Sequence, residues 1–395
     1  MTASPRLPGH RFLHSPGPSR VPDDVLHAMS RQPMDLADPR VDACIAACEI
    51  GLKRLLHTAH DVFVYAANGH GAWEAVIVNL VAPGAKVLVA GTGHFSESWA
   101  VQTEAMGGEV LRTAWVEGLP IDAAEIEAAL RADTAHEIAA VFAVHTDTAS
   151  GVTSDLGALR AAIDRAHHPA LFVVDVVASL AAAPFEMDAL RVDVALGACQ
   201  KGLMLPPGLA FVAVNPKAMQ ASRVNPTPRF YWDWRLRQSP LSYRKFCGTP
   251  PQGLLAGLEA ALALIAHEGE AAVLARHRLL ADAVHAAVER WSEAGALSFF
   301  GRVAEARSVS VTTVAVAPGF DPEAMRHVAR ERFEVAIAGG LGPLAGRAFR
   351  IGHLGDINAA MVLGALAGIE AALTVAAIPF GRGGVSCAVE RLAAG

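Results

Sequence analysis

The first half of the chain alternates runs of apolar residues with segments whose apolar residues recur at helical spacing. Residues 61–67 and 138–146 are such apolar runs, and residues 72–81 have the spacing of a helix. Continuous apolar strands separated by helices are typical of a parallel sheet covered on both faces. Right-handed crossovers then bring the loops that follow the strands to one edge. The pattern predicts an α/β domain with a ligand-binding edge.

The second half of the chain has a different pattern. A stretch rich in proline and tryptophan, residues 225–253, ends the alternation. A long helical pattern follows over residues 254–294, with Gly269 as a possible interruption, and then come strand and helix signals typical of a smaller α+β domain. We predict an N-terminal segment associated with the small domain, a large domain and a small domain, with the limits 1–22, 23–265 and 266–395.

Composition narrows the class of protein. Of 395 residues, 52% are hydrophobic and 18% are charged, against about 25% charged in an average domain. A chain this apolar can bury a large core, and part of its surface is expected to be covered by another subunit. The net charge of −6 gives no basic footprint for nucleic acid.

Membrane and secretion signals are not expected either. The longest apolar stretch, residues 359–380, is interrupted by Glu370 and Pro379 and indicates a buried helix rather than a membrane span. The N-terminus lacks the apolar segment of a secretion signal. The five cysteines are scattered, and Cys44 and Cys48 have no second pair with which to complete a zinc site. Buried thiols in a reducing cytoplasm are the expectation.

Three polar features lie at or near the ends of predicted strands, where open α/β sheets bind ligands. Asp175 is a carboxylate within the apolar run 170–179, where burial is costly without a cationic partner. Lys201 follows the next strand, and apolar surroundings would lower its pKa and make the amine nucleophilic. Residues 68–71, Asn-Gly-His-Gly, join a strand to a helix, and the N–H groups of such a turn suit a phosphate.

One ligand fits all three features. Pyridoxal phosphate has a phosphate, an aldehyde that reacts with a lysine, and a basic ring nitrogen that needs an acidic partner. Each feature alone has an ordinary structural explanation, since a carboxylate at a strand end often accepts backbone hydrogen bonds. Their combination predicts a pyridoxal-phosphate enzyme, with Lys201 and Asp175 at its centre.

Five stretches of the chain are recognisable at this point: residues 15–22, 68–80, 146–155, 173–212 and 349–373. They resemble the class V aminotransferases, specifically the serine–glyoxylate and alanine–glyoxylate group, and they follow the family's order over most of the chain. The run around Lys201, ACQKGLMLPPG, is the most specific. The resemblance implies a fold-type I homodimer with a mostly parallel seven-stranded sheet and the active site at the subunit interface.

The resemblance also implies roles for individual residues. Lys201 would hold the cofactor as a Schiff base and move a proton between substrate and cofactor carbons, while Asp175 would pair with the ring nitrogen. Arg350 would bind the substrate carboxylate bidentately. The ring would lie between Phe95 and Val177, with Thr148 bonded to its hydroxyl, and the phosphate would contact Asn68, Gly69, His70, Gln200 and, from the partner subunit, Thr249.

Simpler interpretations stay open for some of these residues. His70 could be a turn residue between glycines, Phe95 could belong to the core, and Arg350 could form a surface ion pair. The chain also departs from the family pattern: residues 34–40 replace a His-Arg pair near the substrate entrance, and Phe246 stands where a tyrosine is frequent.

The sequence thus predicts a ping-pong transamination from serine or alanine, with aspartate as a further candidate donor, to a small 2-oxo acid such as glyoxylate. The donor is left open, because one methylene separates substrates by only about 1–3 kcal/mol. A lyase or aldolase-type enzyme on the same cofactor is the nearest alternative. A cofactor-binding regulator is a distant one, since it would need a DNA-binding extension.

Overall fold

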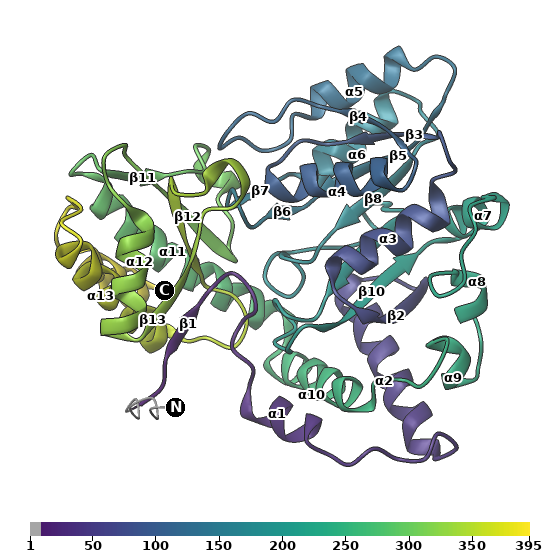
Figure 1. Ribbon diagram of the computed structural model, residues 1–395, viewed down its shortest axis with the longest axis horizontal. Helices are drawn as coiled ribbons and strands as arrows, with labels where there is room; N and C mark the ends of the chain where they lie inside the picture. The colour runs from purple at the N-terminus through teal and green to yellow at the C-terminus, as the bar shows by residue number, and fades with distance from the viewer. Residues whose placement is uncertain (1–8) are drawn as a thin grey trace, which may run out of the picture.

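The computed structural model describes residues 9–395, and its larger region is built on a seven-stranded sheet (Figure 1). Six of the strands are parallel, and β10 runs antiparallel to both of its neighbours. The mostly parallel sheet predicted from the apolar runs is therefore confirmed, with β10 as the exception. In spatial order the strands are β2 (Asp61–Ala67), β10 (Gly208–Val214), β9 (Val194–Ala198), β8 (Leu171–Asp175), β5 (Ile138–Val144), β3 (Lys86–Val89) and β4 (Glu109–Arg112).

Helices cover both faces of this sheet. Side chains of successive strand residues point to opposite faces, and because both sets are apolar, each face needs a cover. In β2, Val62 and Val64 belong to one hydrophobic cluster and Phe63 and Tyr65 to the other. The first cluster includes side chains of α2 (Pro39–Leu56), α5 (Ala123–Ala132), α6 (Leu156–Arg165) and α10 (Gln252–Glu268). The second includes side chains of α3 (Gly69–Leu80), α4 (His94–Ala105), α7 (Pro216–Val224) and α8 (Trp234–Arg237).

Polar side chains fix where several of these helices begin. Asn68, Asp122, Asp155 and Asn215 each accept a hydrogen bond from a backbone N–H of the first turn. Such caps satisfy donors that have no partner within the helix. The helices therefore start at defined residues directly after the loops that leave the sheet.

The smaller region has a five-stranded sheet in the order β1, β13, β14, β12, β11. Its strands are β1 (Phe12–His14), β13 (Val335–Gly339), β14 (Ala348–Gly352), β12 (Val311–Val316) and β11 (Leu297–Phe299). Its core is completed by α11 (Glu270–Ser292), α12 (Pro322–Phe333), α13 (Ala359–Val375) and α14 (Gly384–Ala394). The long helical pattern breaks at Gly269, whose φ is +87°, as its sequence suggested.

The N-terminal part of the chain contacts both regions. Strand β1 pairs in parallel with β13 of the smaller sheet, and α1 (Asp23–Met29) packs on α10. The predicted limits of the three parts, including segment 1–22, stay predictions, and residues 1–8 lie outside the described residues. The remaining elements are short: β6 (Thr146–Asp147), β7 (Val152–Thr153), α9 (Ser242–Lys245), η1 (Ala304–Ala306) and η2 (Gly342–Leu344).

Helix α13 is the buried helix expected over residues 359–380, although it ends at Val375, ahead of Pro379. Within residues 9–395 no helix combines the length and the apolar character needed to span a bilayer.

Candidate active site

A cavity of about 300 Å³ lies at the edge of the large sheet where β2, β8 and β9 end. These three strands are parallel, so their carboxyl ends share one edge. Nine of the predicted cofactor contacts line the cavity: Asn68, Gly69, His70, Phe95, Thr148, Asp175, Val177, Gln200 and Lys201. The structure therefore brings together residues that are up to 133 positions apart in the sequence.

The turn after β2 presents the N-terminus of α3 to this cavity. Asn68 caps the helix, because its Oδ1 accepts from the Gly71 N–H at 3.1 Å. A Cβ at Gly69 would meet only Val177 Cγ2, at 3.4 Å, so the backbone lies close to the cavity wall. Burial lowers the pKa of His70, and neighbouring His94 lowers it further. The turn thus offers backbone donors and a neutral imidazole, which together suit a phosphate.

Asp175 is the last residue of β8, and its carboxylate is buried. Its Oδ1 accepts from the Val177 N–H and its Oδ2 from the Trp73 Nε1–H, each at 2.7 Å. Burial raises the pKa of Asp175 to about 6, although these two hydrogen bonds oppose the rise. Asp175 is therefore held in one orientation and is mostly ionised at neutral pH, so it can pair with a protonated group of a ligand.

Lys201 lies in the turn after β9 and reaches into the same cavity. Its pKa is lowered to about 8, first by burial and then by the charge of Arg350, while Asp175 and Asp147 oppose the change. About a tenth of the amine is then unprotonated at pH 7, far more than for an ordinary lysine, which makes it a nucleophile.

The N-terminal chain crosses directly over Lys201. The amine donates a hydrogen bond to the backbone carbonyl of Pro16, and Ser19 Oγ donates to the backbone carbonyl of Lys201 at 2.8 Å. Gly17 is the point of closest approach, because a Cβ there would come within 2.2 Å of Lys201 Nζ. We call residues 15–19 the strap. Its backbone forms part of the cavity wall, through Gly17 and Pro18.

Phe95 owes its position to a second buried carboxylate. Asp147 Oδ2 accepts from the Phe95 N–H at 2.8 Å, and its Oδ1 accepts from the Ala149 N–H at 2.8 Å. A Cβ at Gly93, where φ is +153°, would collide with this carboxylate at 2.8 Å. Burial raises the pKa of Asp147. Asp147 thus ties the start of α4 to the loop that carries Thr148.

Gln200 and Thr148, the remaining predicted polar contacts in the cavity, differ in whether their hydrogen-bonding atoms have partners. Gln200 Oε1 is buried and has no hydrogen-bond partner among the described residues. A buried polar atom is costly without a partner, but this oxygen can only accept a hydrogen bond, so a phosphate would be bound by the NH2 group of the Gln200 amide and not by its Oε1. Thr148 is buried against the cavity, and its backbone carbonyl accepts from Arg350.

Arg350 does not line the cavity, but it lies against one of its walls. The residue is buried on β14, and its Nε donates to the Gly339 carbonyl at 2.6 Å. Burial lowers its pKa to about 10, which leaves the guanidinium charged at neutral pH. Its interpretation as a surface ion pair is therefore wrong, whereas the bidentate contact with a substrate stays a prediction.

Thr249 is separate from the other predicted residues. It is exposed, in the loop between α9 and α10, and it does not line the cavity of its own chain. The prediction that Thr249 contacts the cofactor of a partner subunit requires such a position, and it stays a prediction.

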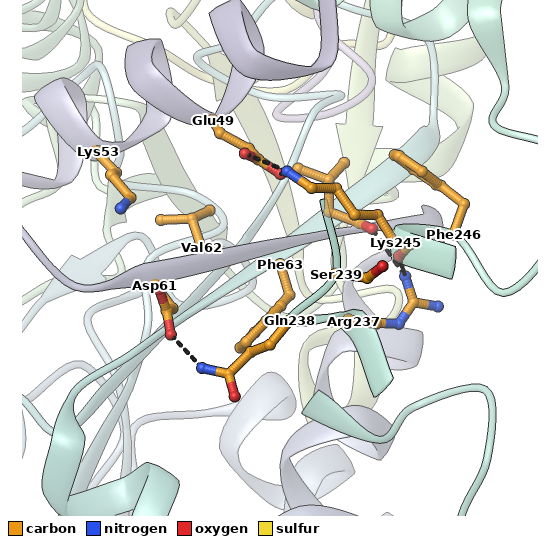
Figure 2. Close-up of a pocket in the computed structure, with 11 residues that line it drawn as sticks. Glu49, Lys53, Asp61, Val62, Phe63, Arg237, Gln238, Ser239, Lys245 and Phe246 are labelled. Atoms are coloured by element: carbon orange, nitrogen blue, oxygen red, sulfur yellow. Dashed lines mark hydrogen bonds and ion pairs between the residues drawn. The ribbon is translucent and has the colours of Figure 1, made fainter. Parts of the chain in front are cut away.

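Another cavity, of about 220 Å³, lies between α2, β2 and the segment 237–246 (Figure 2). Two pairs of its polar side chains contact each other: Lys245 Nζ lies 2.7 Å from Glu49 Oε1, and the Gln238 amide donates to Asp61 at 2.7 Å. Phe246, the residue that departs from the family pattern, also lines it. None of the predicted cofactor contacts does.

Sequence reasoning assigned no role to Asp147, Trp73 or the strap. Asp147 lies three residues after the end of the buried strand β5, between polar residues, so it lacked the apolar flanks that identified Asp175. Trp73 gave no signal either, because an indole in an apolar helix is typical of a core residue. All five cysteines are free thiols, but only Cys48 and Cys199 are buried as expected, and the other three are half-buried. Residues 9–395 contain no cluster of three or more His, Cys, Asp or Glu side chains that could hold a metal ion.

Comparison with known proteins identifies similar chains. The family model described as aminotransferase class-V matches residues 11–344. An L-aspartate–glyoxylate aminotransferase of Paracoccus denitrificans is 39% identical over 379 residues, which cover 95% of this chain and 94% of the relative. A serine–glyoxylate aminotransferase of Methylorubrum extorquens is also 39% identical, with 94% and 93% covered. The crystal structure of ureidoglycine–glyoxylate aminotransferase from Bacillus subtilis superposes with a TM-score of 0.88 at 26% identity, covering 98% of this chain and 99% of that one.

Proposed function

Because this chain belongs to the class-V aminotransferase family, we propose that it moves an amino group from a small amino acid to glyoxylate. The chain is an aminotransferase of the fold-type I architecture, and pyridoxal phosphate is its cofactor. Glyoxylate is the acceptor in the names of all three relatives described above, whereas their donors differ. We propose serine, alanine or aspartate as the donor.

The observation that carries this proposal is the placement of Lys201 and Asp175 on one cavity, beside the N-terminus of α3. When bound, pyridoxal phosphate supplies an aldehyde that reacts with amines and a protonated ring that withdraws electrons from neighbouring carbon atoms. The cavity offers a group for each part: an amine, a buried carboxylate, and the backbone donors at the start of α3 beside the side-chain amide of Gln200. The donor set of the cavity therefore fits this cofactor.

In this proposal the chain's own residues bind, orient and move protons. The amine of Lys201, with its lowered pKa, would accept a proton from the substrate carbon and deliver it to the cofactor carbon. Asp175 would pair with the ring nitrogen and keep it protonated by charge complementarity. Thr148 would contact the ring hydroxyl, and Phe95 and Val177 would exclude water from the ring.

Different residues meet the two acidic groups, the cofactor phosphate and the substrate carboxylate. Asn68, Gly69, His70 and Gln200 hold the phosphate with neutral donors and the dipole of α3. Arg350 binds the substrate carboxylate, because it is a buried cation whose Nη2 makes no hydrogen bond within residues 9–395.

We further propose a homodimer in which Thr249 completes the phosphate site of the partner. Large apolar side chains are exposed along the segment from α7 to α9, with Val224 at 73% and Phe230 at 72%. Leu241 and Tyr243 are also exposed there, close in sequence to Thr249. Such a patch favours burial by association. A cytoplasmic location, in keeping with five free thiols, is part of the same proposal.

The test is an absorbance titration of the purified holoenzyme. L-serine, L-alanine and L-aspartate are added separately, each followed by glyoxylate. A donor should convert the visible band of the lysine-bound cofactor to the aminated form, and glyoxylate should restore it. A band that never converts, with release of ammonia or an aldehyde in the absence of an oxo acid, would indicate a lyase and contradict the proposal.

A further inference from the structure

Trp73 lies where three of the predicted cofactor contacts meet. Its indole Nε1–H donates to Asp175 Oδ2 at 2.7 Å. Its ring lies 4.5 Å from that of His70 and 6.4 Å from that of Phe95, between centroids. Trp73 also lines the cavity, yet nothing in the reaction requires an indole there.

The indole has little freedom to move. Trp99 stacks on it with centroids 5.5 Å apart and an angle of 8° between the planes, and Phe142 stacks on Trp99 at 4.3 Å and 17°. All three side chains are buried, in the hydrophobic cluster that α3 and α4 share with the sheet. A hydrogen bond from so constrained a ring fixes its acceptor as well.

We propose that Trp73 is a positioning residue that holds the Asp175 carboxylate ionised and aimed at the cofactor's ring nitrogen. The inference rests on the proposed function, because it takes the ring nitrogen as the partner of Asp175.

The chemistry of the donor gives the direction of the effect. An indole N–H donates and cannot accept, so its hydrogen bond favours the ionised carboxylate over the protonated one. The Val177 N–H acts in the same sense on Oδ1, whereas burial and the nearby Asp147 favour protonation, and Lys201 opposes it. Without the indole N–H, a proton shared between Asp175 and the ring nitrogen moves toward Asp175. The ring then loses positive charge and withdraws electrons less strongly.

The chain provides a matched control. Trp99 is equally buried and belongs to the same stack, but its Nε1 has no hydrogen-bond partner among the described residues. Trp73→Phe and Trp99→Phe therefore cause similar losses of packing, and only Trp73→Phe removes a used donor.

Two measurements test the proposal. The first needs no cofactor: the carboxyl band of Asp175, assigned by its loss in Asp175→Asn, is titrated by infrared difference spectroscopy in the cofactor-free protein. Loss of a hydrogen bond to a charged group should raise the proton affinity of Asp175 about tenfold in Trp73→Phe and leave it unchanged in Trp99→Phe. The second is the single-turnover rate with the best donor, which should fall about tenfold in Trp73→Phe at an unchanged KM.

A double-mutant cycle separates positioning from packing. Once Asp175→Asn is present, Trp73→Phe should cause no further loss of rate. If Trp73→Phe does not fold, 3-benzothienylalanine at position 73 keeps the ring shape and lacks the N–H, and the same outcomes apply. Equal behaviour of the Trp73 and Trp99 variants in the titration would overturn the inference. Failure of the holoenzyme to react with any donor would instead contradict the proposed function, because the cofactor-free titration does not depend on it.

Discussion

Arg350 donates a hydrogen bond from Nη1 to the backbone carbonyl of Thr148 at 3.0 Å, although 202 positions separate the two residues. Arg350 belongs to β14 of the smaller sheet, and Thr148 follows the strand β5 of the larger one. Arg350, the proposed binding residue for the substrate carboxylate, and Thr148, a predicted cofactor contact, are thus held together across the two regions. A substrate carboxylate bound by Arg350 would lie beside the cavity because of this contact.

Replacement of Arg350 should therefore weaken binding of carboxylate substrates. Arg350→Ala removes the buried guanidinium, and we expect kcat/KM to fall about 100-fold, because a lost charge-assisted pair costs about 2–5 kcal/mol. Arg350→Lys should recover only part of this, since an ammonium lacks the planar pair of donors. Steady-state kinetics with each donor measures both. Arg347→Ala, which breaks an exposed pair with Glu117, is the control and should change kcat/KM less than twofold. An Arg350→Ala variant with unchanged kinetics would show that another residue binds the carboxylate.

The lowered pKa of Lys201 predicts how fast the cofactor-free protein captures pyridoxal phosphate at each pH. Only the unprotonated amine attacks an aldehyde, so the rate should rise with pH and level off above about 8. Arg350→Gln removes a charge that lowers this pKa, so its plateau should begin at higher pH. Stopped-flow appearance of the visible band, with cofactor in excess, gives the two profiles. A profile that continues to rise to pH 10 in the unaltered protein would mean an ordinary exposed lysine.

Lys201→Ala should abolish turnover and the band of the lysine-bound cofactor together. The amine is both the attachment point and the proton carrier, and groups that act as one unit show losses of about 10³-fold or more. Cofactor affinity should persist at a reduced level, because the contacts of α3 and Asp175 remain. Equilibrium dialysis measures the affinity, and a coupled assay of glyoxylate amination measures turnover. Activity retained within tenfold would exclude Lys201 from its central role.

The parts of the fold that could be predicted include the strands that are buried on both faces of the sheet. Strands β5 and β8 are continuous apolar runs because helices cover them from both sides, and this leaves a clear pattern. The three residues of β1 carry no period, and their pairing with β13 depends on residues more than 300 positions away. The antiparallel direction of β10 is likewise set by the loop that returns from Lys201, not by its own composition.

The same reasoning applies to the site. Asp175 could be predicted because a charge in an apolar strand is expensive and needs a partner. Trp73 could not, because its packing is that of a core residue and its hydrogen bond is visible only once α3 packs on the sheet. Gly17 looked like one glycine among 35, and only the path of the strap over Lys201 gives it a role.

That path makes Gly17 the most sensitive position of the strap. Gly17 has a φ of +145°, which side chains rarely adopt, and a Cβ there would lie 2.2 Å from Lys201 Nζ and 2.5 Å from its Cε. Gly17→Ala must therefore displace either the strap or the lysine. We expect cofactor capture and turnover to fall about tenfold or more, since a small misplacement of a reacting group costs up to about 100-fold.

Gly84→Ala separates this effect from backbone strain. Gly84 has a φ of +77°, and a Cβ there would meet nothing within 4 Å. Both variants should lose at least about 1–2 kcal/mol of stability because a non-glycine residue is held at positive φ, and Gly17→Ala should lose more because its Cβ also displaces its neighbours. Only Gly17→Ala should lose cofactor capture, because only its new methyl group reaches the active lysine. Thermal unfolding of the cofactor-free proteins measures the shared effect, and the visible band measures the specific one. If Gly17→Ala captures the cofactor as fast as Gly84→Ala, the strap moves away from Lys201 without cost, and its contact with the amine has no part in the reaction.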